Sequence, residues 1–263
     1  MMLLACCAKS EGPVVDTPVA TDEPKVTKDG TPIHGYEIVK AYPHDTGAYT
    51  QGLLIVDGVL YESTGRLGES SVRIVDLETG KPEKVRPISS SLFGEGLAAV
   101  GGVLYQITWK AGRALVFDRE TLRPLEYEYR YDGEGWGLTT SPEGLVMSDG
   151  TTDVIQFLNP KGFKVLRTIE VSDGGRPVYD LNELEWINGE IWANVWKSDR
   201  VARIDPETGK VLAWIDFSGL LGGLRVGSPT EDVLNGIAYD ADTGNIYVTG
   251  KRWPRLFHVR IVD

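Results

Sequence analysis

The sequence predicts an all-β fold, a single five-bladed β-propeller, and three observations carry this prediction. A short motif recurs five times, starting at residues 51, 95, 136, 182 and 235, so successive copies lie 44, 41, 46 and 53 residues apart. Several β-prone runs follow each copy and are separated by turn residues. No window shows the helical periodicity and capping residues of an α-helix. Four strands in a unit of this length are typical of a propeller blade.

The repeated motif opens the first strand of each unit. Its five copies read Gln51-Gly-Leu, Glu95-Gly-Leu, Trp136-Gly-Leu, Asn182-Glu-Leu and Asn235-Gly-Ile. In four units a tight turn then separates the first strand from the second, at Asp57-Gly58, Gly101-Gly102, Glu143-Gly144 and Asn188-Gly189. These pairs indicate β-hairpins, because glycine and asparagine accept the positive φ that such turns require.

A third and a fourth strand complete each unit. The predicted third strands cover residues 72–75, 114–117, 153–157, 201–204 and 256–259. Turns such as residues 76–80 and 205–209 follow, and outer strands are expected at 165–171 and 211–216. The last unit ends after three strands, whereas residues 36–42 form a β-prone run that has no unit of its own. We expect this N-terminal strand to complete the last blade, which would close the ring and cover a sheet edge. A β-sandwich or an unrelated β-solenoid is the alternative.

Composition narrows the classes of function. The chain has 263 residues, 41% of them hydrophobic and 25% charged, as expected of a globular protein with a sizeable core. The formal net charge of −11 makes nucleic acid an unlikely partner, because the surface repels phosphate. Cys6 and Cys7 are the only cysteines, so we expect no disulfide within the folded body. His34, His44 and His258 are scattered without ligand spacing, so no zinc site is expected, and the expected site contains no metal.

The first 30 residues differ in character from the rest. Leu3-Leu-Ala-Cys6 resembles the end of a bacterial lipoprotein signal, although the basic segment that opens such a signal is missing. Residues 8–30 are rich in Pro, Asp, Glu, Thr and Lys and are expected to form a flexible tether. We therefore expect a signal-like start and tether at 1–30 and one propeller domain at 31–263. The expected protein is a periplasmic or extracellular monomer with a possible lipid anchor at Cys6; a meaningless apolar start is the alternative.

The chemistry is expected at one mouth of the propeller channel. The first strand of each blade lines this channel, so the first motif residues converge there from five distant segments. They supply one carboxylate, three amides and one indole: Gln51, Glu95, Trp136, Asn182 and Asn235. Such a polar ring suits a binding site, since sites lie in concave places. Trp109 and Trp196 are expected near the same mouth, whereas Trp186, Trp192, Trp214 and Trp253 fit ordinary blade packing.

Two charged residues are candidates for catalysis. Glu95 follows Phe93 and Gly94, which suggests a partly desolvated setting that would raise the carboxyl pKa and suit acid–base catalysis. Lys251 ends the second strand of the last blade and would offer a fixed positive charge if it points inward. Taken singly, a glutamate or a lysine on a strand is more often solvated or ion-paired, and a tryptophan is more often part of the core.

Six motifs resemble those of the plant and bacterial glutaminyl cyclases, the papaya-latex type. They are Phe93-Gly-Glu95-Gly-Leu, Thr108-Trp-Lys, Glu134-Gly-Trp-Gly-Leu-Thr, Asn182-Glu-Leu-Glu-Trp, Asn194-Val-Trp and Val248-Thr-Gly-Lys-Arg-Trp-Pro. The resemblance covers roughly residues 36–263 and implies a five-bladed propeller. It also implies that peptides or proteins with an N-terminal glutamine are converted to pyroglutamate with release of ammonia, and that no cofactor is needed. The animal-type cyclase, a zinc-dependent α/β enzyme, is different.

The resemblance assigns roles to nine residues. It implies that Glu95 is the acid–base residue and that Gln51, Asn182 and Lys251 hydrogen-bond the substrate and the developing oxyanion. It implies an aromatic pocket of Phe93, Trp109, Trp136 and Trp196. Tyr49 stands where the family usually has phenylalanine, and its hydroxyl is expected to narrow the pocket.

Two other functions remain open from the sequence. Glu95, Asn182 and Asn235 can also be interpreted as oxygen ligands for Ca²⁺ in a lactonase-like propeller hydrolase. A non-catalytic peptide-binding propeller is the second alternative, because a fold alone does not determine function. A chelator would inhibit the first, and the second would release no ammonia.

Overall fold

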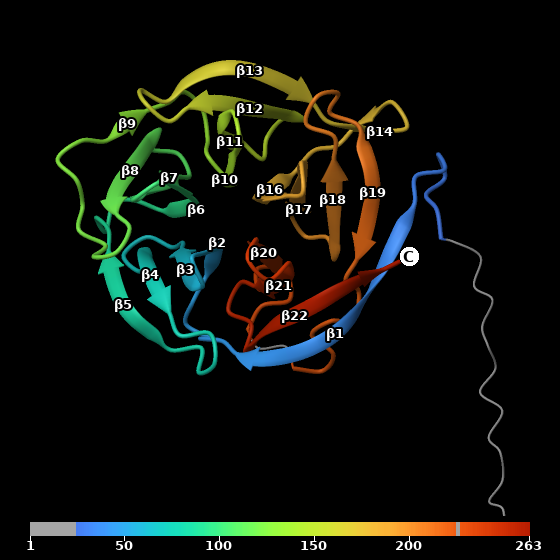
Figure 1. Cartoon of the computed structure of the whole chain (residues 1–263), viewed down its shortest axis with the longest axis horizontal. Coiled ribbons are helices and arrows are strands. Elements are labelled where there is room, and N and C mark those ends of the chain that lie inside the picture. Colours follow the sequence, from blue (N-terminus) through green and yellow to red (C-terminus); the bar gives the residue numbers. More distant parts are fainter. Residues whose placement is uncertain (1–24, 225–226) are drawn as a thin grey trace, which may run out of the picture.

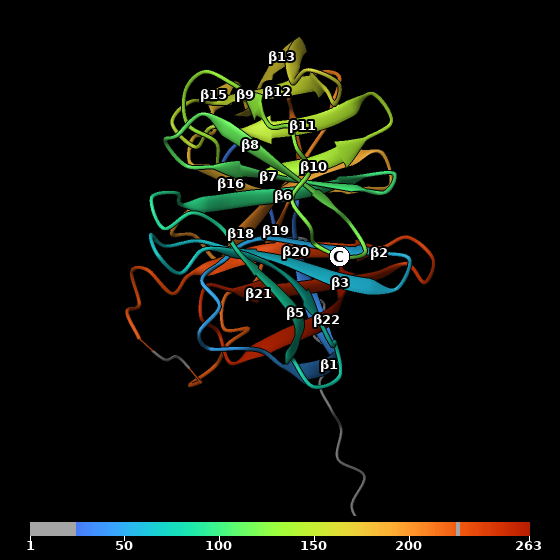
Figure 2. The ribbon, with the colours of Figure 1, turned by 90° about the vertical axis from the view of Figure 1, so that its left-hand side faces the viewer.

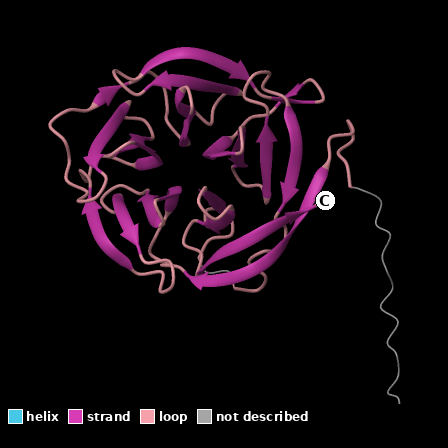
Figure 3. Cartoon of the chain, viewed as in Figure 1, coloured by secondary structure: helices cyan, strands magenta, loops and turns pink. Residues whose placement is uncertain are grey.

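Five blades of β-strands surround a central axis in the computed structural model, which describes residues 25–224 and 227–263 (Figure 1). Every regular element in these two ranges is a strand, and loops join the strands (Figure 3). The described residues accordingly contain no helix that could cross a membrane. The predicted all-β propeller with five blades is confirmed.

Each blade begins with its innermost strand, which runs along the axis. Figure 1 looks down this axis, which is horizontal in the side view of Figure 2. In that side view β6 and β10 lie nearly horizontally, and they therefore run along the axis. The inner strands are β2 (Thr50–Val56), β6 (Gly94–Val100), β10 (Leu138–Ser141), β16 (Leu181–Ile187) and β20 (Leu234–Asp240). Four of the five repeated motifs fall at the start of these strands, and Trp136 lies two residues before β10, so the predicted placement of the motif is confirmed.

Three further strands continue each of the first four blades outward by antiparallel pairing. The second strands are β3 (Val59–Thr64), β7 (Val103–Thr108), β11 (Gly144–Ser148) and β17 (Glu190–Val195). The third are β4 (Ser71–Val75), β8 (Arg113–Asp118), β12 (Val154–Asn159) and β18 (Arg200–Ile204). The outer strands are β5 (Pro82–Pro87), β9 (Tyr129–Arg130), β13 (Lys164–Glu170) and β19 (Val211–Asp216). A small hairpin of β14 (Ser172–Asp173) and β15 (Arg176–Pro177) follows blade three.

The N-terminal strand closes the ring. Blade five has only three strands from its own segment, β20, β21 (Asn245–Gly250) and β22 (Arg255–Val262). Its outer strand is β1 (Ile33–Pro43), which pairs antiparallel with β22 from Gly35–Val262 to Pro43–Arg255. This confirms the prediction for residues 36–42. The start of β1 also pairs in parallel with β19, so blades four and five form one continuous sheet.

The segment before β1, residues 25–32, contacts the start of β1 and the hairpin of β14 and β15. Ile33 donates a backbone hydrogen bond to the carbonyl of Lys25, and Val26 forms a bridge with Pro32. Asp29 pairs with Arg176 of β15 at 3.3 Å. The division at residue 30 between a tether and the domain stays a prediction, and residues 1–24 lie outside the described part of the chain.

The structure differs from the sequence prediction at two places, the hairpin turn of blade three and the outer strand of blade two. The hairpin turn of blade three lies at Pro142 and Glu143, because Gly144 already pairs with Ser141 as the first residue of β11. The outer strand of blade two is reduced to the two residues of β9. By contrast, Asp57-Gly58 and Asn188-Gly189 both have positive φ at each turn residue, as the sequence indicated.

The hydrophobic core lies between blades rather than inside any one of them. Five buried clusters each join side chains of two adjacent blades. Near the axis there is no space even for a methyl group: a Cβ on Gly96 would lie 2.4 Å from the backbone N of Leu138, and one on Gly137 1.9 Å from the carbonyl O of Asn182. Glycine in the motif therefore lets neighbouring inner strands approach closely, which brings their first residues together at the mouth.

A buried ion pair joins blade five to blade one. The Nδ1 of His44, directly after β1, donates to the carbonyl of Trp253 at 2.7 Å, and its Nε2 lies 3.0 Å from Oε1 of Glu62. Burial lowers the pKa of His44, but the charge of Glu62 and both hydrogen bonds outweigh burial and raise it. Burial raises the pKa of Glu62, but the charges of His44 and Arg73 outweigh it and lower the pKa. Both shifts favour the charged forms of the pair, an imidazolium and a carboxylate.

We expect His44→Ala to lower the free energy of unfolding by up to about 3–5 kcal/mol, because the buried carboxylate of Glu62 loses its nearest charged partner and keeps only Arg73 at 3.9 Å and the hydroxyl of Thr50. Urea denaturation measures this change. The stabilisation from Glu62 is present above its ordinary pKa of 4.5 and is lost as the pH falls through its lowered value. The stabilisation from His44 is present below 6.5 and is lost as the pH rises through its raised value.

Glu78→Ala is the matched control for this prediction. It removes the exposed partner of Lys40, which lies 2.8 Å away, and should change the unfolding free energy by less than about 1 kcal/mol. Equal effects of the two substitutions would contradict a structural role for the buried pair.

Candidate active site

A cavity of about 210 Å³ lies at one mouth of the channel. Its lining consists of the nine residues that the sequence analysis singled out: Tyr49, Gln51, Phe93, Glu95, Trp109, Trp136, Asn182, Trp196 and Lys251. They come from all five blades. Asn235, the fifth first-position motif residue, does not line this cavity. The structure thus brings the predicted residues together, while their individual roles stay predictions.

Glu95 is the acidic group of the cavity. Its side chain is only 4% exposed, and Oε1 accepts a hydrogen bond from Nε2 of Gln51 at 3.0 Å. Oε2 has no hydrogen-bond partner among the described residues. Burial raises the pKa of Glu95 well above its usual range; the charge of Lys251 opposes this rise and that of Glu134 adds to it. A raised carboxyl pKa suits a group that takes up and returns a proton during a reaction.

A chain of two amides orients Glu95. The Nδ2 of Asn235 donates to Oε1 of Gln51 at 3.0 Å, and Gln51 in turn donates from Nε2 to Glu95. The amide nitrogen of Asn235 is a donor only, so it must face the oxygen of the Gln51 amide. The nitrogen of the Gln51 amide then faces Glu95. Asn235 is thus a positioning residue that the sequence analysis placed at the mouth but did not assign to the site.

Lys251 is the basic group of the cavity. It directly follows β21, and its backbone N–H bonds the carbonyl of Val233, which holds it at the mouth. It points inward, the condition under which we expect it to offer a fixed positive charge, since its exposure is 3% and its ammonium lies 5.0 Å from the ring centre of Tyr49. Burial lowers the pKa of Lys251 to about 8, against the opposing charges of Glu95 and Glu231.

Asn182 supplies a second polar group. It is 2% exposed, and its Oδ1 has no partner among the described residues. Its backbone carbonyl accepts a hydrogen bond from Oγ of Ser148 at 2.8 Å, which ties the start of β16 to blade three. The residues that line the cavity therefore include two buried oxygens, Oε2 of Glu95 and Oδ1 of Asn182, that have no hydrogen-bond partner among the described residues.

Aromatic rings form the walls in two groups. Phe93 makes edge-on contacts with Tyr49 and Trp109, with ring centres 6.2 and 5.7 Å apart. Trp136 meets Trp196 edge-on at 5.5 Å. Such a wall excludes water and strengthens the electrostatic interactions inside the cavity. Trp192, Trp214 and Trp253 are buried in blade packing and Trp186 is partly buried there, as expected.

Glu134 joins the two halves of this wall. Its Oε2 accepts hydrogen bonds from Nε1 of Trp109 at 2.6 Å and from Nε1 of Trp136 at 3.0 Å. Its Oε1 lies 3.4 Å from the ammonium of Lys110. Glu134 lies in one of the family-like motifs, but its sequence context predicts no role for it, because nothing local indicates that a tryptophan 25 residues earlier reaches the same oxygen.

Two further buried carboxyls lie in the channel below the site. Glu183 accepts backbone hydrogen bonds from Leu53 and Ile237 at 3.3 and 2.9 Å, which joins blade four to blades one and five. Burial raises the pKa of Glu183 well above its usual range and that of Glu185 to about 8. The described residues contain no group of three or more His, Cys, Asp or Glu side chains close enough to hold a metal ion.

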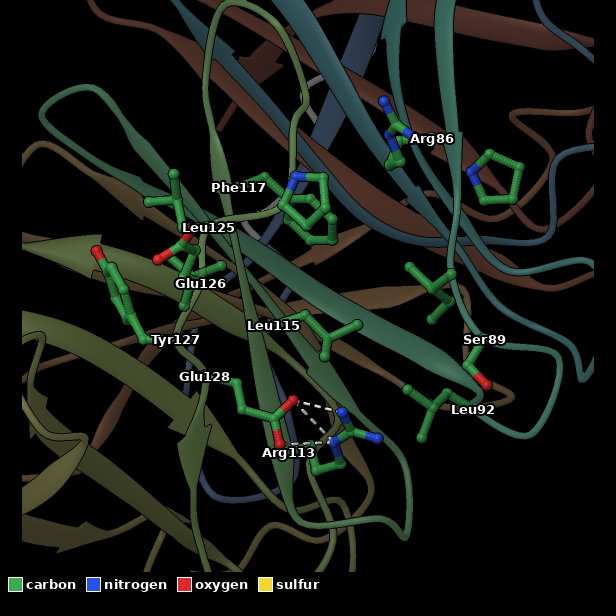
Figure 4. A pocket seen from close by; sticks show the side chains of 14 residues that line it. Arg86, Ser89, Leu92, Arg113, Leu115, Phe117, Leu125, Glu126, Tyr127 and Glu128 are labelled. Carbon is green, nitrogen blue, oxygen red and sulfur yellow. Dashed lines mark hydrogen bonds and ion pairs between the residues drawn. The ribbon is translucent and has the colours of Figure 1, made fainter.

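A larger cavity, about 460 Å³, lies beside the short outer strand of blade two (Figure 4). Two of its charged groups pair with each other: Arg113 donates from Nε to Glu128 at 3.0 Å (Figure 4). Apolar side chains such as Leu115 and Leu125 cover the rest of the lining. This cavity lacks the buried, unpaired oxygens of the smaller one, so cavity size does not locate the chemistry.

Comparison with known proteins gives three concordant matches. The family model described as glutamine cyclotransferase matches residues 13–261. A glutaminyl-peptide cyclotransferase of Arabidopsis thaliana is 44% identical over 231 residues, which is 87% of this chain and 72% of that protein. The crystal structure of Myxococcus xanthus glutaminyl cyclase is 42% identical, covers 88% of this chain and 97% of its own, and superposes with a TM-score of 0.81. A streptogramin B lyase structure is 10% identical with a TM-score of 0.51, a likeness of fold alone.

Proposed function

This chain belongs to the glutamine cyclotransferase family, and we propose that its mouth cavity is where N-terminal glutamine is converted to pyroglutamate with release of ammonia. It is an enzyme of peptides that begin with glutamine, and the lactonase-like and non-catalytic alternatives are set aside. One observation supports the location most directly: a single buried carboxyl of raised pKa faces a cavity that also contains a buried lysine. The cavity is smaller than sites for drug-sized ligands, about 300–1,000 Å³, so it suits one residue of a peptide.

The proposed proton path uses Glu95 alone. The α-ammonium of the substrate gives a proton to the Glu95 carboxylate, and the neutral amine attacks the Cδ of its own side chain. A protonated Glu95 beside a neutral substrate amine holds the same number of protons as a Glu95 carboxylate beside a substrate ammonium. The raised pKa of Glu95 is therefore compatible with this first step. Glu95 then protonates the departing amide nitrogen as the Cδ–N bond breaks. It finally takes the second proton from the new ring nitrogen and returns it to ammonia, which leaves as ammonium.

The oxyanion that forms at Cδ needs a positive partner. Lys251 is buried in the same cavity and supplies that charge below its pKa of about 8. Fixed charges in a water-poor cavity stabilise developing negative charge more strongly than water does. The Oδ1 of Asn182 lacks a partner in the described structure and would accept a hydrogen bond from the substrate amine. The aromatic walls would hold the glutamine side chain folded toward its own amine.

The direct test is a coupled assay of ammonia release from a short peptide that begins with glutamine. We expect turnover with the free N-terminus and none when the same peptide is N-acetylated, since acetylation removes the nucleophile. We also propose that no metal takes part, so activity should persist after treatment with EDTA and dialysis. Absence of ammonia from the free peptide would refute the proposed site, and loss of activity with EDTA would refute metal independence.

Location and assembly remain proposals. We propose a periplasmic or extracellular monomer that is anchored by lipid at Cys6, a residue outside the described part of the chain. The support is the sequence Leu3-Leu-Ala-Cys6. Incorporation of labelled palmitate into the expressed protein, and its loss in Cys6→Ser, would test the anchor; sedimentation would test the monomer.

A further inference from the structure

We propose that Glu134 is the positioning residue of the aromatic wall: a single carboxylate oxygen holds the indoles of Trp109 and Trp136 in the arrangement that receives the substrate glutamine. This inference rests on the proposed function of the cavity. Glu134 is not itself a lining residue. It acts on the substrate through the two tryptophans, which line the cavity from different blades.

The hydrogen bonds show how the arrangement is held. Both indole N–H groups donate to the same oxygen, Oε2, at 2.6 and 3.0 Å. An indole N–H can only donate, so each ring has one orientation in which this bond forms. A bond to a carboxylate is stronger than one to a neutral acceptor. The distance between the edges of the two rings is therefore set by one atom.

The backbone around Glu134 is fixed at the same place. The N–H of Gly135 donates to the carbonyl of Trp109 at 3.0 Å, and the N–H of Trp136 donates to the carbonyl of Ser148 at the same distance. The carbonyl of Trp136 accepts from Gly96 at 2.8 Å. The segment thus spans blades two and three with its main chain, and the carboxylate of Glu134 needs little reorganisation to reach both rings.

Packing contacts hold the indoles of Trp136 and Trp109 separately, and the carboxylate of Glu134 connects them. Trp136 packs on Gly150, where an added Cβ would lie 1.9 Å from the ring, and it meets Trp196 edge-on. Trp109 packs on Phe93, with the ammonium of Lys110 4.1 Å from its ring centre. Neither set of contacts links Trp109 to Trp136. Oε2 of Glu134 provides that link.

Glu134 has a second effect that can be measured separately. Two charged groups act on Glu95 through space: Lys251 lowers the pKa of Glu95 and Glu134 raises it. Tyr49 and Tyr131 also lie near Glu95, but both have pKa values raised above 10 and stay neutral in the working range. Removal of the Glu134 charge should therefore move the limb of the kcat/KM profile that reports Glu95 to lower pH.

Two conservative variants separate geometry from charge. Glu134→Gln keeps a carbonyl oxygen at the same reach but loses the charge. Glu134→Asp keeps the charge, but it is one methylene shorter and cannot reach both rings. We expect kcat/KM to fall about tenfold or more in Glu134→Asp, which loses a hydrogen bond to a charged group, and to fall less in Glu134→Gln, which keeps both bonds but with a neutral acceptor. The limb that reports Glu95 should shift in Glu134→Gln and not in Glu134→Asp.

Near-ultraviolet circular dichroism gives a readout that needs no turnover. The tryptophan bands should change in Glu134→Asp and stay close to wild type in Glu134→Gln. Glu143→Ala is the control, because it removes an exposed carboxylate, paired with Arg167, that lies outside the cavity. Wild-type kcat/KM and wild-type tryptophan bands in Glu134→Asp would overturn the proposal, as would equal loss of activity in the two variants. Wild-type protein that releases no ammonia would instead overturn the proposed function, and the dichroism would still test the geometry.

Discussion

The Glu95→Gln variant is expected to remain folded and to lose turnover by about 10²–10⁴-fold, the usual contribution of a general acid–base group. The amide of glutamine cannot accept the proton of the substrate ammonium, and it cannot donate one to the leaving nitrogen. Within residues 25–224 and 227–263, no second carboxyl lines the cavity to take over this role. The loss should appear in kcat, because the variant keeps the cavity that binds the peptide.

The fold of this variant should survive for a local reason. Oε1 of Glu95 accepts its hydrogen bond from Gln51, and the carbonyl oxygen of a glutamine can accept the same bond. Thermal unfolding and steady-state ammonia release would be measured together. Glu190→Gln is the control, because Glu190 pairs with Arg203 on blade four, outside the cavity. Near-normal ammonia release from Glu95→Gln would remove Glu95 from the mechanism.

The Lys251→Met variant is expected to lose about 10²–10³-fold in kcat, the effect of removing one group that stabilises an oxyanion. Methionine retains an apolar, flexible side chain in the cavity but carries no charge. Loss of this charge should also raise the pKa of Glu95 further, because Lys251 is the group that opposes the effect of burial. Rapid-quench or steady-state assays at saturating peptide would measure the change in kcat. The control is Lys84→Met, an exposed lysine on β5.

The pH dependence distinguishes a catalytic charge from a packing role for Lys251. Its pKa is lowered to about 8, so the ammonium is charged below that pH and neutral above it. We therefore expect kcat to decline as the pH rises through about 8. In Lys251→Arg, whatever its absolute rate, this decline should move far to alkaline pH, since guanidinium keeps its charge beyond about pH 12. An unchanged alkaline limb in Lys251→Arg would show that another group titrates.

Most of the fold could be predicted because its signals are local. Each blade repeats a hairpin with Gly or Asn at the turn, and the φ values at Asp57-Gly58 and Asn188-Gly189 show why those residues were informative. The register of β11 was less predictable, since Gly144 can belong either to a turn or to a strand. The shortness of β9 and the parallel pairing of β1 with β19 depend on neighbouring elements and have no local signature.

The lining of the cavity could be predicted because the repeat places equivalent residues at one mouth, and because the motifs resemble those of a known family. Gln51, Glu95, Trp136 and Asn182 all follow from their position in the repeat. Asn235 occupies the same position but points its amide at Gln51 instead of the cavity. The sequence pattern cannot distinguish these outcomes, because a rotation about one side-chain bond decides between them.

By itself, the sequence determined how many blades form, where their strands turn and which residue types gather at the channel mouth. These properties follow from periodicity and turn chemistry within stretches of about 50 residues. Only the tertiary structure decided that Gln51 donates to Glu95, that His44 pairs with Glu62, and that one oxygen of Glu134 binds two indoles. Such choices depend on distances of about 3 Å between side chains from different blades, and hydrogen bonding is that short-ranged.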